Sequence, residues 1–185
     1  MGADGNDSLG GAYESNDYYG ATDLGDGYLR GNAYIGGTGD DTLTGTTYSD
    51  TYRFELWDGD DTIIDQFKSG WTSSAVNNSD EILFDSGEIT IENIILEQSG
   101  SNLVIRYGGG GDQVTVQDWY TDSRHQVEEI ETVHGDTLLN TQVDQLIQAM
   151  ATFTANQGGI SWEQAVADHN DDTRAILTSH WQQAA

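Results

Sequence analysis

The chain has no cysteine, no proline and very few basic residues. Six Lys and Arg stand against 32 Asp and Glu in 185 residues, which gives a formal net charge of −26. Without Cys the chain can form neither a disulfide nor a thiolate metal site. The shortage of Lys and Arg argues against nucleic acid as a partner, because nucleic acid is bound through clustered basic side chains. No apolar run approaches the length of a membrane span, so we expect no direct membrane insertion.

The negative charge has to be balanced for the chain to fold. Aspartates and glutamates in such excess repel one another in a compact state, so the chain either stays disordered or binds cations. Complete disorder does not fit, because 10% of the residues are aromatic and the apolar residues are grouped in periodic segments. The composition therefore indicates a fold that depends on bound cations.

The N-terminus carries no ordinary export signal. The opening MGADGNDSLG has neither the basic nor the apolar region of a signal peptide. Repeat-like sequence follows Met1 at once, so we expect an upstream part of the same parent protein. Any catalytic or adhesive activity of the parent is expected there.

Composition and periodicity divide the chain into three parts, 1–65, 66–139 and 140–185. The first is rich in Gly and Asp, and the second alternates β-forming with polar residues, as in SNLVIRY and DQVTVQDW. In the third, Ser161 and Gln164 form a capping box for a helix that starts near Trp162. Helical spacing in this part joins the apolar residues Val143, Leu146, Ile147, Met150, Leu177 and Trp181.

One segment of the first part is a complete repeat. Residues 36–44, GGTGDDTLT, fit the nonapeptide G-G-x-G-x-D-x-U-x, where U is a large apolar residue, with Asp41 and Leu43 in the last two specified positions. Residues 45–53 keep the register, with Asp50 and Tyr52. Residues 2–10 match with Asp7 and Leu9, and 56–64 match with Asp61 and Ile63 after a two-residue slip.

The spacing of the nonapeptide has a physical reason. Glycines permit a tight turn whose carbonyls point inward, the Asp adds a carboxylate, and the x-U-x triplet forms a short strand that buries U. One repeat makes half a coil, so turns 18 residues apart stack and can hold an ion between them. Asp41 is then expected to stack on Asp23 and, after the slip, on Asp61. Asp50 meets only Asn32, which is a weaker ligand.

Oxygen donors in flexible turns favour Ca²⁺ over Zn²⁺ and Mg²⁺, so we expect several Ca²⁺ ions. The strongest site is predicted between turns 36–41 and 56–61. Between 11 and 35 the register blurs, and Asp80 in NNSDEILF resembles a further half-turn that closes the coil. The candidate metal ligands are Asp7, Asp17, Asp23, Gly36, Gly37, Thr38, Gly39, Asp41, Gly45, Thr47, Asp50, Asp58, Asp61 and Asp80. The alternative is an acidic, glycine-rich linker that binds no ion.

The repeats and the segments that follow resemble the C-terminus of RTX (haemolysin-type) proteins. QDWYTDSRHQVEEIE, VDQLIQAMATF and ILTSHW are similar to the ends of RTX toxins of the adenylate cyclase type and of large RTX adhesins. The resemblance implies a mainly β fold: a parallel β-roll over 1–65, a β-rich cap over 66–139, and a helical tail over 140–185. It also implies a secreted or cell-surface protein, exported by a type I secretion machinery that reads an uncleaved signal in the tail.

The sequence raises the question of two other functions, glycan binding and catalysis. Trp57, Trp71 and Trp119 could stack on a sugar ring, which would make the chain a Ca²⁺-shaped module for a glycan such as a polysaccharide. Enzymatic activity is not expected, because the four histidines form no H-E-x-x-H pair and no G-x-S-x-G elbow is present. Trp119 also fits a cap, since a stack of repeats needs a closed apolar end.

Overall fold

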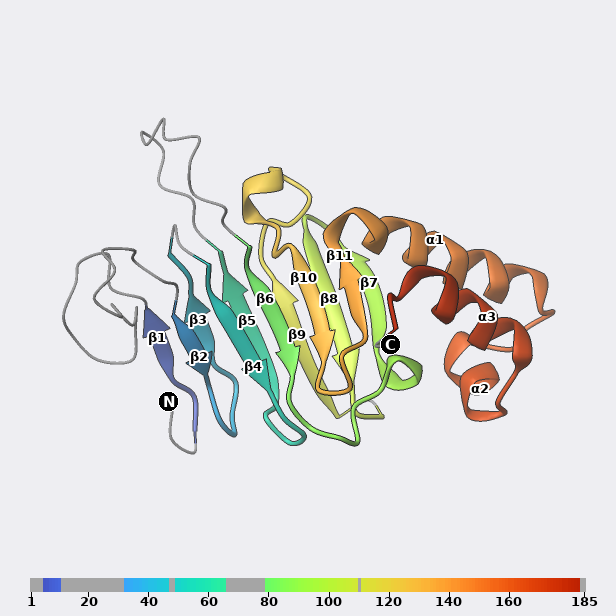
Figure 1. Cartoon of the computed structure of the whole chain (residues 1–185), viewed down its shortest axis with the longest axis horizontal. Coiled ribbons are helices and arrows are strands. Elements are labelled where there is room, and N and C mark those ends of the chain that lie inside the picture. The colour runs from blue at the N-terminus through green and yellow to red at the C-terminus, as the bar shows by residue number, and fades with distance from the viewer. Residues whose placement is uncertain (1–4, 11–31, 47–48, 66–78, 110, 184–185) are drawn as a thin grey trace.

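The strands of this chain are short and the apolar residues within them alternate, which suits two facing sheets. The computed structural model describes residues 5–10, 32–46, 49–65, 79–109 and 111–183. Its strands form a six-stranded and a five-stranded sheet, and its α-helices gather at one end of the strand stack (Figure 1).

The first sheet has the strand order β1-β3-β5-β9-β8-β7 and the second has the order β11-β10-β6-β4-β2. The first consists of β1 (Ser8–Gly10), β3 (Thr42–Thr44), β5 (Asp60–Ile64), β7 (Ile95–Ser99), β8 (Asn102–Tyr107) and β9 (Asp112–Val116). The second consists of β2 (Ala33–Ile35), β4 (Thr51–Phe54), β6 (Glu81–Phe84), β10 (Glu129–Thr132) and β11 (Thr137–Leu139).

Successive strands from β2 to β6 alternate between the two sheets. Strand β3 pairs in parallel with β5, so that Leu43 lies beside Ile63. Strand β4 pairs in parallel with β2 and β6, so that Tyr52 lies beside Tyr34 and Ile82. Each apolar position of the repeat therefore stacks on its equivalent one coil away.

The stacked apolar residues form one hydrophobic core between the sheets. Leu43, Tyr52 and Ile63 are completely buried, whereas the residues on either side of them in the chain are half-buried or exposed. Phe84 of the second sheet meets Tyr107 of the first, with ring centroids 4.7 Å apart. Such contacts join the sheets, because aromatic pairs add to the free energy gained by burial alone.

Both sheets continue beyond the repeats. Strand β9 pairs in parallel with β5, and β10 pairs in parallel with β6. The pairing then becomes antiparallel, through β9, β8 and β7 in the first sheet and through β10 and β11 in the second. The predicted cap thus shares its sheets with the repeats, and the sheet does not end at the half-turn of Asp80.

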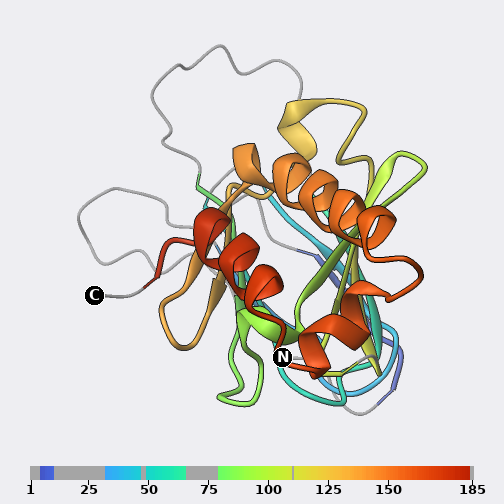
Figure 2. The ribbon, with the colours of Figure 1, turned by 90° about the vertical axis from the view of Figure 1, so that its right-hand side faces the viewer.

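Three described α-helices follow the last strand, and Figure 2 looks onto the end of the stack that they cover. They are α1 (Asn140–Asn156), α2 (Trp162–Ala167) and α3 (Asp171–His180), and two 3-10 turns precede them, η1 (Ile91–Asn93) and η2 (Ser123–His125). Helix α1 contacts β7 and β11, which are the last strands of the two sheets. The helices therefore lie against edge strands that would otherwise be open to pairing with another chain.

Several expectations from the sequence are confirmed. Helix α1 buries Val143, Leu146 and Met150 as the helical spacing predicts, and Ser161 caps α2 by accepting the Gln164 N–H at 3.2 Å. Trp119, as expected of a cap residue, is 1% exposed. The mainly β class is confirmed in part, because all the described strands lie before α1 and three described α-helices follow β11.

One stacking prediction is wrong. The strand beside β3 is β1, with Leu9 next to Leu43, so the turn below Asp41 carries Asp7 and not Asp23. The two paired strands are 34 positions apart instead of 18. A regular 18-residue period predicts residues 24–26 beside β3, whereas the described neighbour on this side is Ser8–Gly10.

Candidate metal centre

Aspartates of the first sheet form a hydrogen-bonded row beside the strands. Asp41 precedes β3 and Asp61 lies in β5, and the register places the two side by side. The Asp7 N–H donates to Asp41 Oδ1 at 2.6 Å, and the Asp41 N–H donates to Asp61 Oδ1 at 2.9 Å. Each carboxylate therefore accepts, through one of its oxygens, a hydrogen bond from the backbone of the preceding turn in the stack.

The second oxygen of each carboxylate lacks such a donor. Asp41 and Asp61 are 1% and 2% exposed, and their Oδ2 atoms are buried without a hydrogen-bond partner among the described residues. A buried charged oxygen without a donor is costly, because it has lost its water and gained nothing in exchange. A cation at these oxygens would remove that cost.

Glycine is needed at positions where the backbones of neighbouring turns lie close together. Gly39 and Gly59, each two residues before the aspartate, have φ values of 128° and 104°, a region that side chains rarely adopt. A Cβ on Gly59 would press on the carbonyl oxygen of Gly39 in the turn below. A Cβ on Gly36 would collide with Asp41 Oδ2, so only glycine at this position leaves room for that oxygen.

The second sheet carries an equivalent row. The Asn32 N–H donates to Asp50 Oδ1 and the Asp50 N–H donates to Asp80 Oδ1, both at 2.7 Å. The Asp80 N–H in turn donates to Glu128 Oε2 at 2.7 Å. Asp50 Oδ2 accepts from the backbone and the hydroxyl of Thr46, at 2.6 and 3.0 Å. The same side-chain-to-backbone connection is thus repeated in both sheets.

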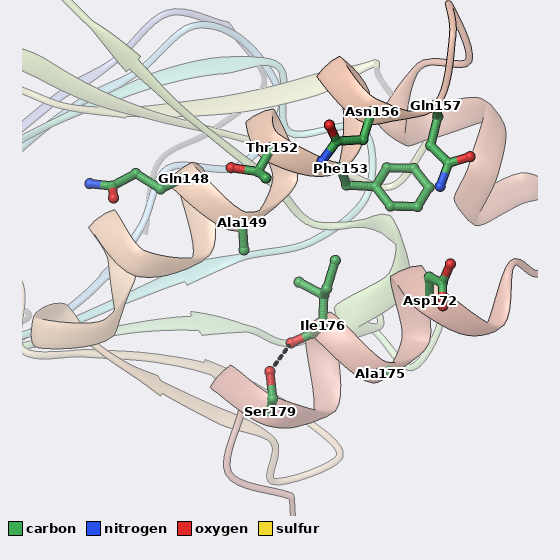
Figure 3. Close-up of a pocket in the computed structure, with 10 residues that line it drawn as sticks. All are labelled: Gln148, Ala149, Thr152, Phe153, Asn156, Gln157, Asp172, Ala175, Ile176 and Ser179. Carbon is green, nitrogen blue, oxygen red and sulfur yellow. Dashed lines mark hydrogen bonds between the residues drawn. The ribbon is translucent and has the colours of Figure 1, made fainter.

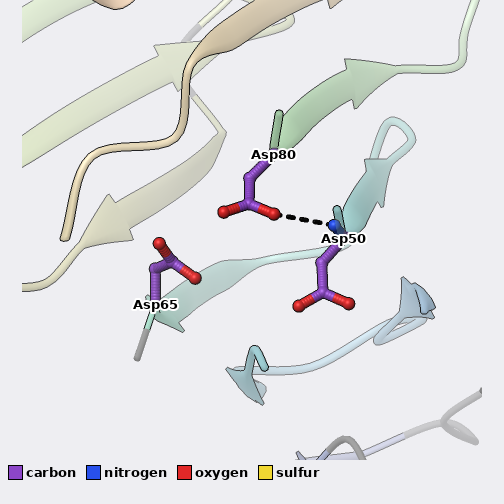
Figure 4. Close-up of side chains that lie close together, drawn as sticks. All are labelled: Asp50, Asp65 and Asp80. Carbon is purple, nitrogen blue, oxygen red and sulfur yellow. Dashed lines mark hydrogen bonds between the residues drawn. The ribbon is translucent and has the colours of Figure 1, made fainter. Parts of the chain in front are cut away.

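Three buried carboxylates converge beside this second row. Asp50, Asp65 and Asp80 each offer one oxygen, and the three oxygens lie within 4.8 Å of one another. Figure 4 shows the three side chains arriving from different strand ends around a common space. They are 0%, 3% and 0% exposed. Three carboxylates in so small a volume are a ligand set for a divalent cation bound through oxygen.

Burial makes these carboxylates weak acids when no cation is present. It raises the pKa of Asp80, and the neighbouring Asp65 carboxylate raises it further. Burial likewise raises the pKa of Asp65, with Asp50 as the next cause. In the first row burial raises the pKa of Asp61 to about 7. The cause is the same in each case, because a low-dielectric, like-charged surrounding disfavours the ionised form.

The remaining predicted ligands lie around the two rows. Asp58 is buried and accepts the Glu55 N–H at 2.7 Å. Gly45 faces the three-carboxylate cluster, since a Cβ there would lie 2.8 Å from Asp65 Oδ1 and 3.2 Å from Asp50 Oδ2. Gly36, Gly37, Thr38 and Gly39 lie between β2 and Asp41, and the Thr38 carbonyl accepts the Gly5 N–H. Asp17, Asp23 and Thr47 lie outside the described residues.

The structure brings more carboxylates together at Asp50 than the sequence predicts. Asp41 and Asp61 are brought together as expected for the site between turns 36–41 and 56–61. Asp50, however, is not limited to Asn32 as a neighbour, because Asp65 and Asp80 face it from the other side. The closest convergence of carboxylates among the described residues is therefore at Asp50.

Sequence reasoning missed three acidic residues beside these rows. Asp65 follows β5 and occupies the position that Gly45 has after β3, so it stands at a glycine position of the repeat. Glu128 precedes β10 as Asp50 precedes β4. Asp112 begins β9. An acidic residue next to a strand was the available signal for each, but only the strand pairing shows which of them face the rows.

Two surface hollows lie away from these carboxylates. A groove of about 620 Å³ lies between α1 and α3. Phe153 and Ile176 are among its apolar lining residues, and Asp172 is the one carboxylate among the residues that line it (Figure 3). A second hollow of about 380 Å³ lies beside Arg106 and Trp162. Neither brings together the carboxylates of a hard-cation site.

One of the three tryptophans proposed to stack on a sugar lies in the core. Trp119 is 1% exposed and belongs to the core, whereas Trp57 is 78% exposed. Trp71 lies outside the described residues. Stacking on a sugar ring requires an accessible aromatic face, so Trp119 cannot take part in it.

Comparison with known proteins agrees with the chemistry of the rows. Residues 102–136 match the family model of the haemolysin-type calcium binding protein related domain. A comparison with curated proteins gives no match. No helix in the described part of the chain is both long and apolar enough to cross a membrane. The family match supports an RTX-like chain, and with it calcium as the cation and an extracellular or secreted location.

Proposed function

We propose that the chain is a non-catalytic, Ca²⁺-binding C-terminal module of a larger exported protein, which folds when it meets calcium outside the cell. One observation carries the proposal: buried carboxylate oxygens of Asp50, Asp65 and Asp80 converge, and the buried Oδ2 atoms of Asp41 and Asp61 lack a donor among the described residues. Their ligand chemistry suits Ca²⁺, which takes six to eight oxygen ligands in flexible sites.

The same observation explains why folding would wait for the ion. Without a cation the fold has to bury several mutually repelling carboxylates, whose raised pKa values express that penalty. Ca²⁺ binds only where the turns are stacked, so its binding free energy becomes folding free energy. Extracellular modules bind Ca²⁺ at roughly 10⁻⁴ to 10⁻³ M. Such a chain would remain unfolded inside the cell and fold on emergence.

Three parts with different roles follow from this proposal. Residues 1–65 belong to a parallel β-roll, for which the alternation of parallel strands between two sheets is the support. Residues 66–139 cap it, and 140–185 carry the signal for the type I secretion machinery. The parent protein is a toxin or an adhesin. The alternative, a Ca²⁺-shaped module for a glycan, has less support, because Trp119, one of its three tryptophans, is buried in the core.

Calorimetric titration tests the calcium claim. A triple variant, Asp50→Asn with Asp65→Asn and Asp80→Asn, is expected to bind fewer Ca²⁺ ions than the wild type, because it removes the three converging charges. The matched control replaces three exposed acids, as Glu97→Gln, Asp168→Asn and Asp172→Asn, and should keep the wild-type ion number. Equal loss in both variants would mean that overall charge, and no defined centre, holds the calcium.

A further inference from the structure

The turns of the first row are linked by a repeated backbone hydrogen bond. The Gly5 N–H donates to the Thr38 carbonyl and the Gly39 N–H donates to the Asp58 carbonyl, both at 2.7 Å. In each pair the glycine lies two residues before the row aspartate. The next glycine in this position is Gly59, whose N–H would meet the carbonyl of a further turn if the repeats continued.

The Asp112 carboxylate takes the place of that further turn. Gly59 donates to Asp112 Oδ1 at 3.3 Å, and Trp57 of the same turn donates to Asp112 Oδ2 at 2.9 Å. Asp112 is 5% exposed and begins β9, whose register with β5 sets Val114 beside Asp61. One side chain therefore satisfies two N–H groups that the end of the repeats would leave without a partner.

The second row also ends at a carboxylate, which here takes the place of the next row aspartate. Asp50 donates its N–H to the Asp80 carboxylate, and Asp80 donates its own to Glu128 Oε2 at 2.7 Å. Glu128 directly precedes β10, which pairs with β6 so that Glu129 lies beside Glu81. Glu128 thus occupies the place of the row aspartate in a coil that is no longer a repeat.

We infer that Asp112 and Glu128 are positioning residues that terminate the two rows and hold the last ion-binding turns in shape. Both lie in the segment 102–136, so this segment would act through two carboxylates as well as through its apolar residues. The inference rests on the proposed calcium binding. A turn already held in its bound geometry loses less conformational freedom when the ion arrives, so the last sites should bind more tightly.

The test compares Ca²⁺ folding midpoints, measured by circular dichroism, of full-length Asp112→Asn and Glu128→Gln with those of Asp118→Asn and Glu129→Gln. All four remove one negative charge from the same segment. The Asp118 carboxylate accepts hydrogen bonds from the Ser101 hydroxyl and the Gln117 side-chain amide, and neither residue belongs to the rows. Relief of repulsion alone would lower every midpoint or leave it unchanged. We expect the first two variants to raise it by about twofold to fivefold, because a hydrogen bond to a charged acceptor is weakened.

Amide hydrogen exchange at saturating Ca²⁺ separates positioning from a general loss of stability. Asp112→Asn should speed exchange at Trp57 and Gly59, and Glu128→Gln at Asp80, while Val104 in β8 stays as protected as in the wild type. A variant too unstable to fold at saturating Ca²⁺, or one with uniform loss of protection, would show a structural role only and overturn the inference. The inference would also be overturned if Asp112→Asn and Glu128→Gln both had the wild-type midpoint. If the wild type itself did not bind Ca²⁺, the proposed function would be rejected instead.

Discussion

Asp41 and Asp61 of the first row each use their two carboxylate oxygens in different ways. In Asp41 and Asp61 one oxygen accepts a backbone N–H and the other is buried without a donor among the described residues. An amide side chain can still accept the backbone hydrogen bond, but it carries no charge and presents one oxygen in place of two. The role of these residues in ion binding can therefore be separated from their role in holding the turns.

Asp41→Asn and Asp61→Asn should each raise the Ca²⁺ concentration at the folding midpoint, because loss of a charged ligand interaction costs roughly 1.5–3 kcal/mol. Circular dichroism during a Ca²⁺ titration measures the midpoint. The control is Asp172→Asn, which removes an exposed carboxylate of α3 and should leave the midpoint unchanged. Equal shifts in all three variants would contradict the assignment of a site to Asp41 and Asp61.

Burial also predicts how the ion-free chain responds to pH. It raises the pKa of Asp58 to about 6 and that of Asp61 to about 7. A carboxyl group whose pKa is higher in the folded than in the unfolded state makes the fold bind protons more tightly. Its contribution to stability is then complete below about pH 4 and is lost as the pH rises through the folded pKa.

In metal-free buffer, lowering the pH from about 8 to about 5 should therefore increase the folded fraction. Far-ultraviolet circular dichroism measures the change. Asp61→Asn should reduce the pH response, because the variant has no proton to bind at this position, whereas Asp172→Asn should retain it. Loss of ion-free structure on acidification would have the wrong sign for this account.

At the scale of elements, local patterns could be predicted from the sequence and distant pairings could not. The x-U-x triplets correctly predicted β3 and β4, and helical spacing predicted α1, because a strand or a helix depends on the residues within it. The pairing of β1 with β3 joins residues 34 positions apart. A long intervening segment adds little to the entropy of closing the chain, so the local pattern holds no record of the partner.

In the candidate site, too, some residues could be predicted from the local sequence and others could not. Asp41, Asp50, Asp61 and Asp80 were found from the repeat and do lie in the two rows. Asp65 stands at a glycine position, and Glu128 follows no repeat, so neither fits the pattern. Their places beside the rows depend on the parallel pairing of β5 with β3 and of β10 with β6, which a single sequence does not display.

The helical tail permits a test of export. If residues 140–185 carry the secretion signal, as we propose, fusing them behind an unfolded passenger should direct it through a type I secretion system. The passenger would be measured in the culture medium. The matched control is the same passenger fused to 79–139, which should stay in the cell. Secretion of the full chain after deletion of the tail would contradict this placement of the signal.

At the scale of the whole molecule, the excess of acidic residues works against the fold until a cation is bound. The net charge of −26 opposes compaction, and part of that charge is buried in the two rows. General screening by salt would weaken repulsion between exposed charges but would not supply ligands to buried oxygens. Calcium should therefore act as a specific ligand, and neither sodium nor magnesium should replace it.

Circular dichroism of the whole chain, begun in chelator and followed through a titration with Ca²⁺, tests this central claim most directly. The account predicts little β signal in chelator and a steep, cooperative gain at a few millimolar free Ca²⁺, because several ions bind to one folded state. Na⁺ or Mg²⁺ at about tens of millimolar should not restore the signal. A chain already fully folded in chelator would contradict the account.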